Sequence, residues 1–100
     1  MENKAMNQRK KADKIFTGRQ LYRLTELFLI DPDGIFCKTL RERILANNFT
    51  EEILVKTIDY VIDHVEPNFL SIASVMKAKQ AVEEYEANKI RLYPAFGTGD

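Results

Sequence analysis

Side chains able to bind a metal ion or transfer protons gather in one short stretch: Asp59, Asp63, His64 and Glu66. A metal site requires several ligands that converge on one point. In a helix, Asp59 and Asp63 share a face at i, i+4 spacing, but His64 is turned by about 100° from Asp63. The pattern therefore favours solvated charges, and the sole histidine is expected to have a structural role at a helix C-terminus, where the helix dipole favours positive charge.

Two other features are typical of sites but lack the partners that a site needs. The segment Asp31-Pro32-Asp33-Gly34 begins like a calcium loop, without the third acidic position before the glycine or the final glutamate, so a turn is expected. Cys37 is the only cysteine and falls on an apolar helix face, which predicts a buried, inert thiol. The chain has no glycine-rich phosphate loop and no Ser/His/Asp set. We therefore expect no catalytic residues, no metal, no cofactor and no enzymatic activity.

Charge is distributed unevenly although the formal net charge is zero. The first 23 residues carry Lys4, Arg9, Lys10, Lys11, Lys14, Arg19 and Arg23 against only Glu2 and Asp13. A basic arm on an acidic body is compatible with nucleic-acid binding, or with docking on an acidic partner. The candidate nucleic-acid contacts are Arg9, Lys10, Lys11, Lys14 and Arg19, and the alternative is a solvated tail.

Length and composition indicate one globular domain. The chain has 100 residues, of which 45% are hydrophobic and 30% charged. Its longest apolar run, from Leu27 to Ile30, is far shorter than the roughly 20 residues that span a bilayer. The polar, basic N-terminus is not a secretory signal, and a single cysteine is typical of a reducing cytosol. These features predict a cytoplasmic protein.

Hydrophobic spacing predicts an all-α fold, a small bundle of about four helices at 17–30, 35–46, 50–65 and 71–88. Thr17 and Gln20 have the spacing of a capping box for the first helix, and Thr50 is a suitable N-cap for the third. Asn47 and Asn48 are a plausible stop for the second. The expected organisation is a basic arm (1–16), a helical domain (17–88) and a flexible C-terminal tail (89–100).

The expected contact surface for a partner lies where the apolar stripe of the last helix thins. Beyond Ala78 fewer residues are apolar, so the second half of this helix is expected to project from the body. The candidate contacts are Tyr85, Ile90, Leu92, Tyr93 and Phe96. Large aromatic side chains are frequent anchors when they are buried at an interface. The alternative is that this segment folds back over the core.

A helix-turn-helix formed by the second and third helices is disfavoured by charge. Recognition helices present Arg, Lys, Asn, Gln or Ser to DNA. The third helix carries Glu51, Glu52, Asp59 and Asp63 instead, which would repel phosphates.

The stretch from Phe49 to Ala78 combines a capped helix with an aromatic start and a Pro-Asn-Phe-Leu-Ser-Ile-Ala turn into the next helix. It resembles the helical N-terminal domain of phage-encoded helicase loader and inhibitor proteins. The Ser-Ile-Ala-x-Val element from Ser71 to Val75 matches, whereas Asn68-Phe69-Leu70 replaces the family's paired prolines. The resemblance implies an all-α phage protein that binds a replicative helicase or its host loader ATPase and either delivers the helicase or blocks its loading.

The sequence therefore predicts a non-enzymatic interaction module that acts on DNA replication by occupying a surface its partner needs. The alternatives are nucleic-acid binding through the basic arm and inhibition of another host or defence complex. Apolar residues are numerous in the first and third helices for so small a core, which favours a homodimer.

Overall fold

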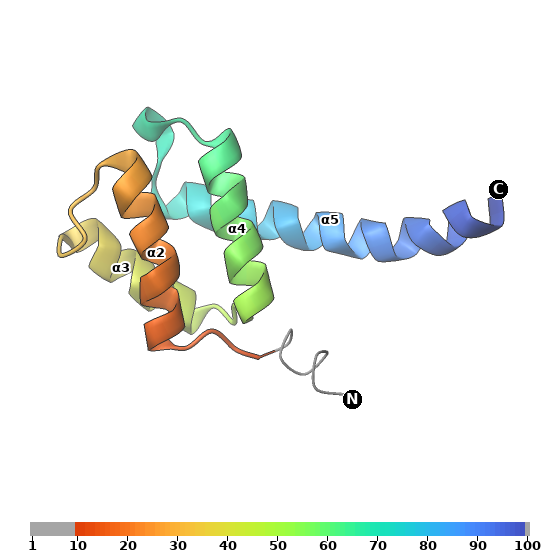
Figure 1. The fold of residues 1–100 in the computed structure, drawn as a ribbon, viewed down its shortest axis with the longest axis horizontal. Coiled ribbons are helices and arrows are strands. Elements are labelled where there is room, and N and C mark those ends of the chain that lie inside the picture. The colour runs from red at the N-terminus through yellow and green to blue at the C-terminus, as the bar shows by residue number, and fades with distance from the viewer. Residues whose placement is uncertain (1–9, 100) are drawn as a thin grey trace.

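The chain folds as a small helical bundle from which the last helix projects (Figure 1). This computed structural model describes the backbone of residues 10–99 and the side chains of residues 10–88. Within that range lie α2 (Lys14–Phe28), α3 (Ile35–Ala46), α4 (Glu51–His64), the short 3-10 helix η1 (Pro67–Phe69) and α5 (Ile72–Gly99). The predicted all-α bundle is confirmed.

The first helix begins three residues earlier than its sequence pattern predicts. Asp13 is the N-cap, and its carboxylate accepts the N–H of Phe16 at 2.8 Å. The proposed cap, Thr17, is fully buried, and its hydroxyl has no partner among the described residues. Thr17 lies on the same stripe as Leu21 and Leu24, so it belongs to the inner face of α2. Residues 14–16 are therefore part of the helical body.

Residues 10–13 are also attached to the body, and we call them the strap. The strap makes one antiparallel bridge, between Lys11 and Thr50. The Ala12 N–H donates to the Phe49 carbonyl at 2.9 Å, and the Glu51 N–H donates to the Lys10 carbonyl at 2.7 Å. The second bond satisfies one of the amides that a helix N-terminus leaves without an intrahelical acceptor. The arm predicted for residues 1–16 is thus folded against the body from Lys10 onward; Arg9 lies outside the described residues.

The turns between helices follow local sequence signals. Leu29 adopts a left-handed conformation (φ 56°) and ends α2, and Asp31 accepts the Asp33 N–H as expected for a turn. The Thr50 hydroxyl accepts the Ile53 N–H at 3.1 Å, which confirms the predicted cap of α4. Ser71 and Ser74 cap each other's amides at the start of α5.

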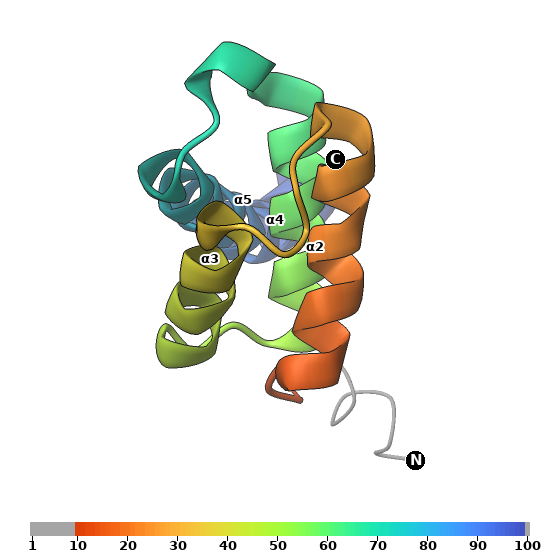
Figure 2. The same cartoon turned by 90° about the vertical axis from the view of Figure 1, so that its left-hand side faces the viewer.

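The core lies where α4 packs between α2 and α5, with α3 closing the side (Figure 2). Its buried members are the strap residue Ala12, Phe49 of the α3–α4 connection and apolar side chains from all four described α-helices: Leu21, Leu24, Leu40, Ile44, Leu54, Ile58, Val61, Val75 and Ala78. Cys37 is buried as predicted, and burial raises the pKa of its thiol.

Helix α5 continues well beyond its predicted end near Asn88. Val75, Ala78 and Val82 are buried against the body, while Tyr85 is 64% exposed. From there the helix runs away from the bundle to Gly99 (Figure 1). The predicted projection of its second half is therefore confirmed for the backbone, but the predicted tail from residue 89 is helical up to Gly99.

Thr57 provides a test of how the core is packed. Its side chain is fully buried in α4, and its hydroxyl has no hydrogen-bond partner among the described residues. A buried hydroxyl without a partner costs about 1–3 kcal/mol. We expect Thr57→Val, which keeps the branched shape, to raise the free energy of unfolding by about 1 kcal/mol in urea titrations.

The matched control is Thr25, also buried, whose hydroxyl donates to the Tyr22 carbonyl at 2.8 Å. Thr25→Val removes that bond and should lower stability by about 1 kcal/mol. Equal destabilisation by both variants would mean that Thr57 is hydrogen-bonded in solution.

Candidate functional site

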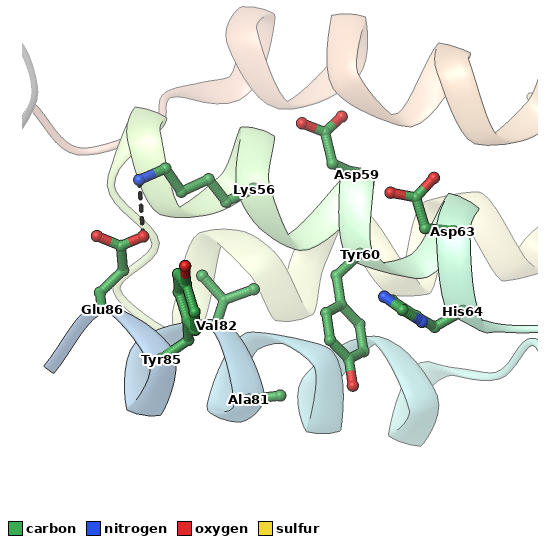
Figure 3. A pocket seen from close by; sticks show the side chains of 9 residues that line it. All are labelled: Lys56, Asp59, Tyr60, Asp63, His64, Ala81, Val82, Tyr85 and Glu86. Atoms are coloured by element: carbon green, nitrogen blue, oxygen red, sulfur yellow. Dashed lines mark hydrogen bonds and ion pairs between the residues drawn. The ribbon is translucent and has the colours of Figure 1, made fainter. Parts of the chain in front are cut away.

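An open groove lies between α4 and α5, close to where α5 leaves the body. It has a volume of about 470 Å³. One face of α4 contributes Lys56, Asp59, Tyr60, Asp63 and His64, and α5 contributes Ala81, Val82, Tyr85 and Glu86 (Figure 3). At one end of the groove α4 and α5 are joined by the contact between Lys56 and Glu86.

The floor and walls of the groove are apolar and aromatic. Val82 is 6% exposed and belongs to the inner face of α5, whereas Tyr85, one turn further on, is 64% exposed. On the α4 side the Tyr60 ring lies against His64, with ring centroids 4.4 Å apart. Figure 3 shows Tyr60 and Tyr85 flanking Ala81. Exposed tyrosines beside a buried apolar floor form a surface that a partner side chain can cover with little rearrangement.

The rim of the groove carries charged pairs. Lys56 reaches Glu86 at 2.8 Å and Glu52 at 3.0 Å, so it joins α4 to α5. The hydrogen bond to Glu86 is the main cause that raises the pKa of Lys56, since it stabilises the ammonium form. Asp59 pairs with Arg23 of α2. Among the described side chains Asp63 has no ion-pair partner within 4 Å, so it is the acidic group of this rim that a ligand cation can reach.

The structure places the predicted contact residues in different settings. Tyr85 forms one wall of the groove. Ile90, Leu92, Tyr93 and Phe96 belong to the helical backbone of α5 but lie outside the residues whose side chains are described. Tyr85 alone of the predicted set can therefore be assigned to a site.

The predicted nucleic-acid residues do not line this groove. Lys10, Lys11, Lys14 and Arg19 are all exposed, two of them on the strap and two on α2. Lys10 faces Glu51, with its Nζ 3.9 Å from the carboxylate. Arg9 is outside the described residues.

Sequence reasoning missed Tyr60 and the Lys56–Glu86 pair. The signal for Tyr60 was present, since Lys56, Tyr60 and His64 recur every four residues on one face of a helix. It was overlooked because Asp59 and Asp63 were interpreted as solvated charges and His64 as a structural residue at a helix C-terminus. No three His, Cys, Asp or Glu side chains are placed to share a metal ion in the part of the chain whose side chains are described.

The groove and the fold define a small all-α protein with an open, aromatic-walled surface next to a projecting helix. No protein-family model, curated protein or solved structure matches this chain. Over the described residues, no helix combines the length and apolar character needed to cross a membrane.

Proposed function

We propose that this protein is a non-enzymatic interaction module that binds a partner protein through the groove between α4 and α5, with Tyr85 as the anchor. The observation that carries the proposal is the contrast between buried Val82 and exposed Tyr85 at neighbouring positions of one helix face. An aromatic side chain held on a rigid helix beside an apolar floor is typical of interface anchors.

The groove also indicates what the partner presents. An apolar side chain suits the floor at Ala81 and Val82, and a lysine or arginine next to it suits Asp63 and the tyrosine faces. A partner segment that carries an apolar anchor flanked by a cation therefore matches this site better than an acidic segment does.

For the partner we propose a replicative helicase or its loader ATPase in the bacterial cytoplasm, as the resemblance of residues 49–78 implies. The mechanism is steric: the bound module covers a surface that the ATPase requires for oligomerisation or for nucleotide-driven movement. Binding in this mode modulates or blocks DNA replication without any reaction at the module itself.

The first experiment is affinity capture from bacterial lysate with the intact chain as bait, followed by mass spectrometry, in parallel with a nuclease-treated sample. Recovery of a replication ATPase in both samples supports the proposal. Recovery that disappears on nuclease treatment would instead support nucleic-acid binding through Lys10, Lys11, Lys14 and Arg19, with affinity that falls steeply as salt increases.

Substitution of Tyr85 tests the groove directly. We expect Tyr85→Ala to weaken binding of the captured ATPase by roughly 30-fold, about 2 kcal/mol, because the side chain is a central anchor. Isothermal titration calorimetry with the purified ATPase measures this change. The matched control is Tyr22→Ala on α2, where the ring is also largely exposed (56%) but lies outside the groove. Equal affinities of the two variants would place the interface elsewhere.

A further inference from the structure

A second apolar surface is formed by residues of the α2–α3 turn, the adjoining helix ends and η1. These segments lie at the end of the bundle opposite the C-terminus (Figure 1). We call it the loop-end patch. Its centre is a pocket of about 180 Å³ lined only by apolar residues: Phe28, Ile30, Phe36, Pro67 and Leu70. Three further large apolar side chains adjoin these residues in the chain and are exposed: Leu29 (90%), Ile35 (78%) and Phe69 (70%).

The local backbone turns these apolar side chains outward. Leu29 has φ 56°, an unusual conformation for a branched residue, and it ends α2 with its side chain exposed. η1 begins at Pro67 and leaves Phe69 exposed although Leu70 is partly buried. Several exposed apolar side chains around a pocket lined by apolar residue types usually mark a surface that is covered in the functional state.

Charge around the patch restricts its occupant. Among the residues that directly adjoin the five lining residues in the chain, only Asp31 and Glu66 are charged, and both are exposed. Asp33, in the same turn as Asp31, is exposed as well. The occupant should therefore combine a large apolar side chain with positive charge.

The C-terminal segment of α5 has this composition. Residues 89–99 include Ile90, Leu92, Tyr93 and Phe96, and their only charged residues are Lys89 and Arg91. Within one molecule the segment cannot reach the patch, because α5 carries it to the far end of the long axis (Figure 1). A second molecule has no such restriction.

We propose that the C-terminal segment of α5, residues 89–99, docks into the loop-end patch of a second copy of this chain. One apolar side chain of the segment fills the pocket, and Lys89 and Arg91 approach Asp31 and Glu66. A donor segment on one copy meets an acceptor patch on the other. When both copies exchange segments, the two identical contacts are related by a two-fold axis and the assembly closes as a dimer. This inference does not depend on partner binding at the Tyr85 groove.

Two full-length variants separate donor from acceptor. Leu92→Asp with Phe96→Asp disables the donor, and Leu29→Ser with Phe69→Ser disables the acceptor at exposed positions where the fold has no buried contact to lose. Ile15→Ser is the control, because Ile15 is 69% exposed at the opposite end of α2. Circular dichroism verifies that each variant keeps its helices.

Sedimentation equilibrium over a wide concentration range provides the measurement. We expect the wild type and Ile15→Ser to self-associate, and each disabled variant to do so at least tenfold more weakly. An equimolar mixture of the two disabled variants should form a 1:1 heterodimer, since one still has a donor and the other an acceptor. A wild type that stays at 11.6 kDa at every concentration, or a mixture that fails to associate, would overturn the proposal.

Discussion

Replacing Phe49 by alanine should lower the free energy of unfolding by about 4 kcal/mol, a large part of the total stability of a domain of this size. Phe49 is 1% exposed and lies in the short connection between α3 and α4. Its ring is buried in the core cluster, and the Lys79 ammonium of α5 lies 5.2 Å from the ring centroid. Truncation leaves a cavity at a point where α5 and the strap both meet the α3–α4 connection, so the site has little freedom to collapse.

Urea denaturation followed by circular dichroism measures the effect, with Phe69→Ala as the matched control. Phe69 is also an aromatic residue in a connection between helices, but it is 70% exposed. At a protein concentration at which the chain is monomeric, its substitution should change stability by no more than about 0.5 kcal/mol. If the two variants unfold at the same urea concentration, Phe49 is not the core residue that its burial indicates.

The elements that could be predicted from the sequence are those fixed by signals a few residues apart. Thr50, followed by two glutamates in the first turn, identified the start of α4. The Asp31-Pro32-Asp33-Gly34 turn identified the end of the first helix. The hydrophobic spacing that predicted a helix at 50–65 also accounts for the burial of Leu54, Ile58 and Val61, because a 3.6-residue period leaves only one face for the core.

Two boundaries were wrong for physical reasons. Thr17 looked like a cap because threonine followed by glutamine has capping-box spacing, yet the same position lies on the buried stripe of α2. The end of α5 was placed near Asn88, but the helical backbone continues to Gly99 through Lys89, Arg91 and Leu92, which are residue types with high helix propensity. Loss of tertiary contacts marks where a helix leaves the body, and it does not mark where the helix ends.

The groove could be predicted only in part, since it is formed by residues from two helices. Tyr85 was identified from its position on a helix whose apolar stripe was thinning. Tyr60 was missed because it lines the groove only when α5 packs beside α4. No pattern within a single helix indicates which other helix it packs against. The strap was missed for the same reason, because the bridge between Lys11 and Thr50 joins residues that are separated in the chain by the whole of α2 and α3.

Introducing an aspartate at Ala12 should lower the free energy of unfolding by about 3 kcal/mol, because the new carboxylate would be placed in the apolar core. Ala12 is 3% exposed, and its amide is bonded to the Phe49 carbonyl. The strap can respond by detaching, so the loss is limited to the free energy that its docking contributes. Detachment would break the hydrogen bonds of the backbone amides of residue 12 and Glu51. Hydrogen exchange of these two amides should therefore accelerate even where helices α2 to α5 remain folded.

Lys11→Asp is the control for this substitution, because Lys11 is the neighbouring residue and is exposed. It should cost less than about 1 kcal/mol. The two variants should also differ in their dependence on pH. Burial raises the folded-state pKa of the carboxylate introduced at position 12 above its unfolded value, so its destabilising effect should begin to diminish as the pH falls through the folded-state pKa and should be lost below the unfolded-state pKa. An equal loss of stability in both variants, independent of pH, would mean that residues 10–13 are a solvated arm and that the core begins at α2.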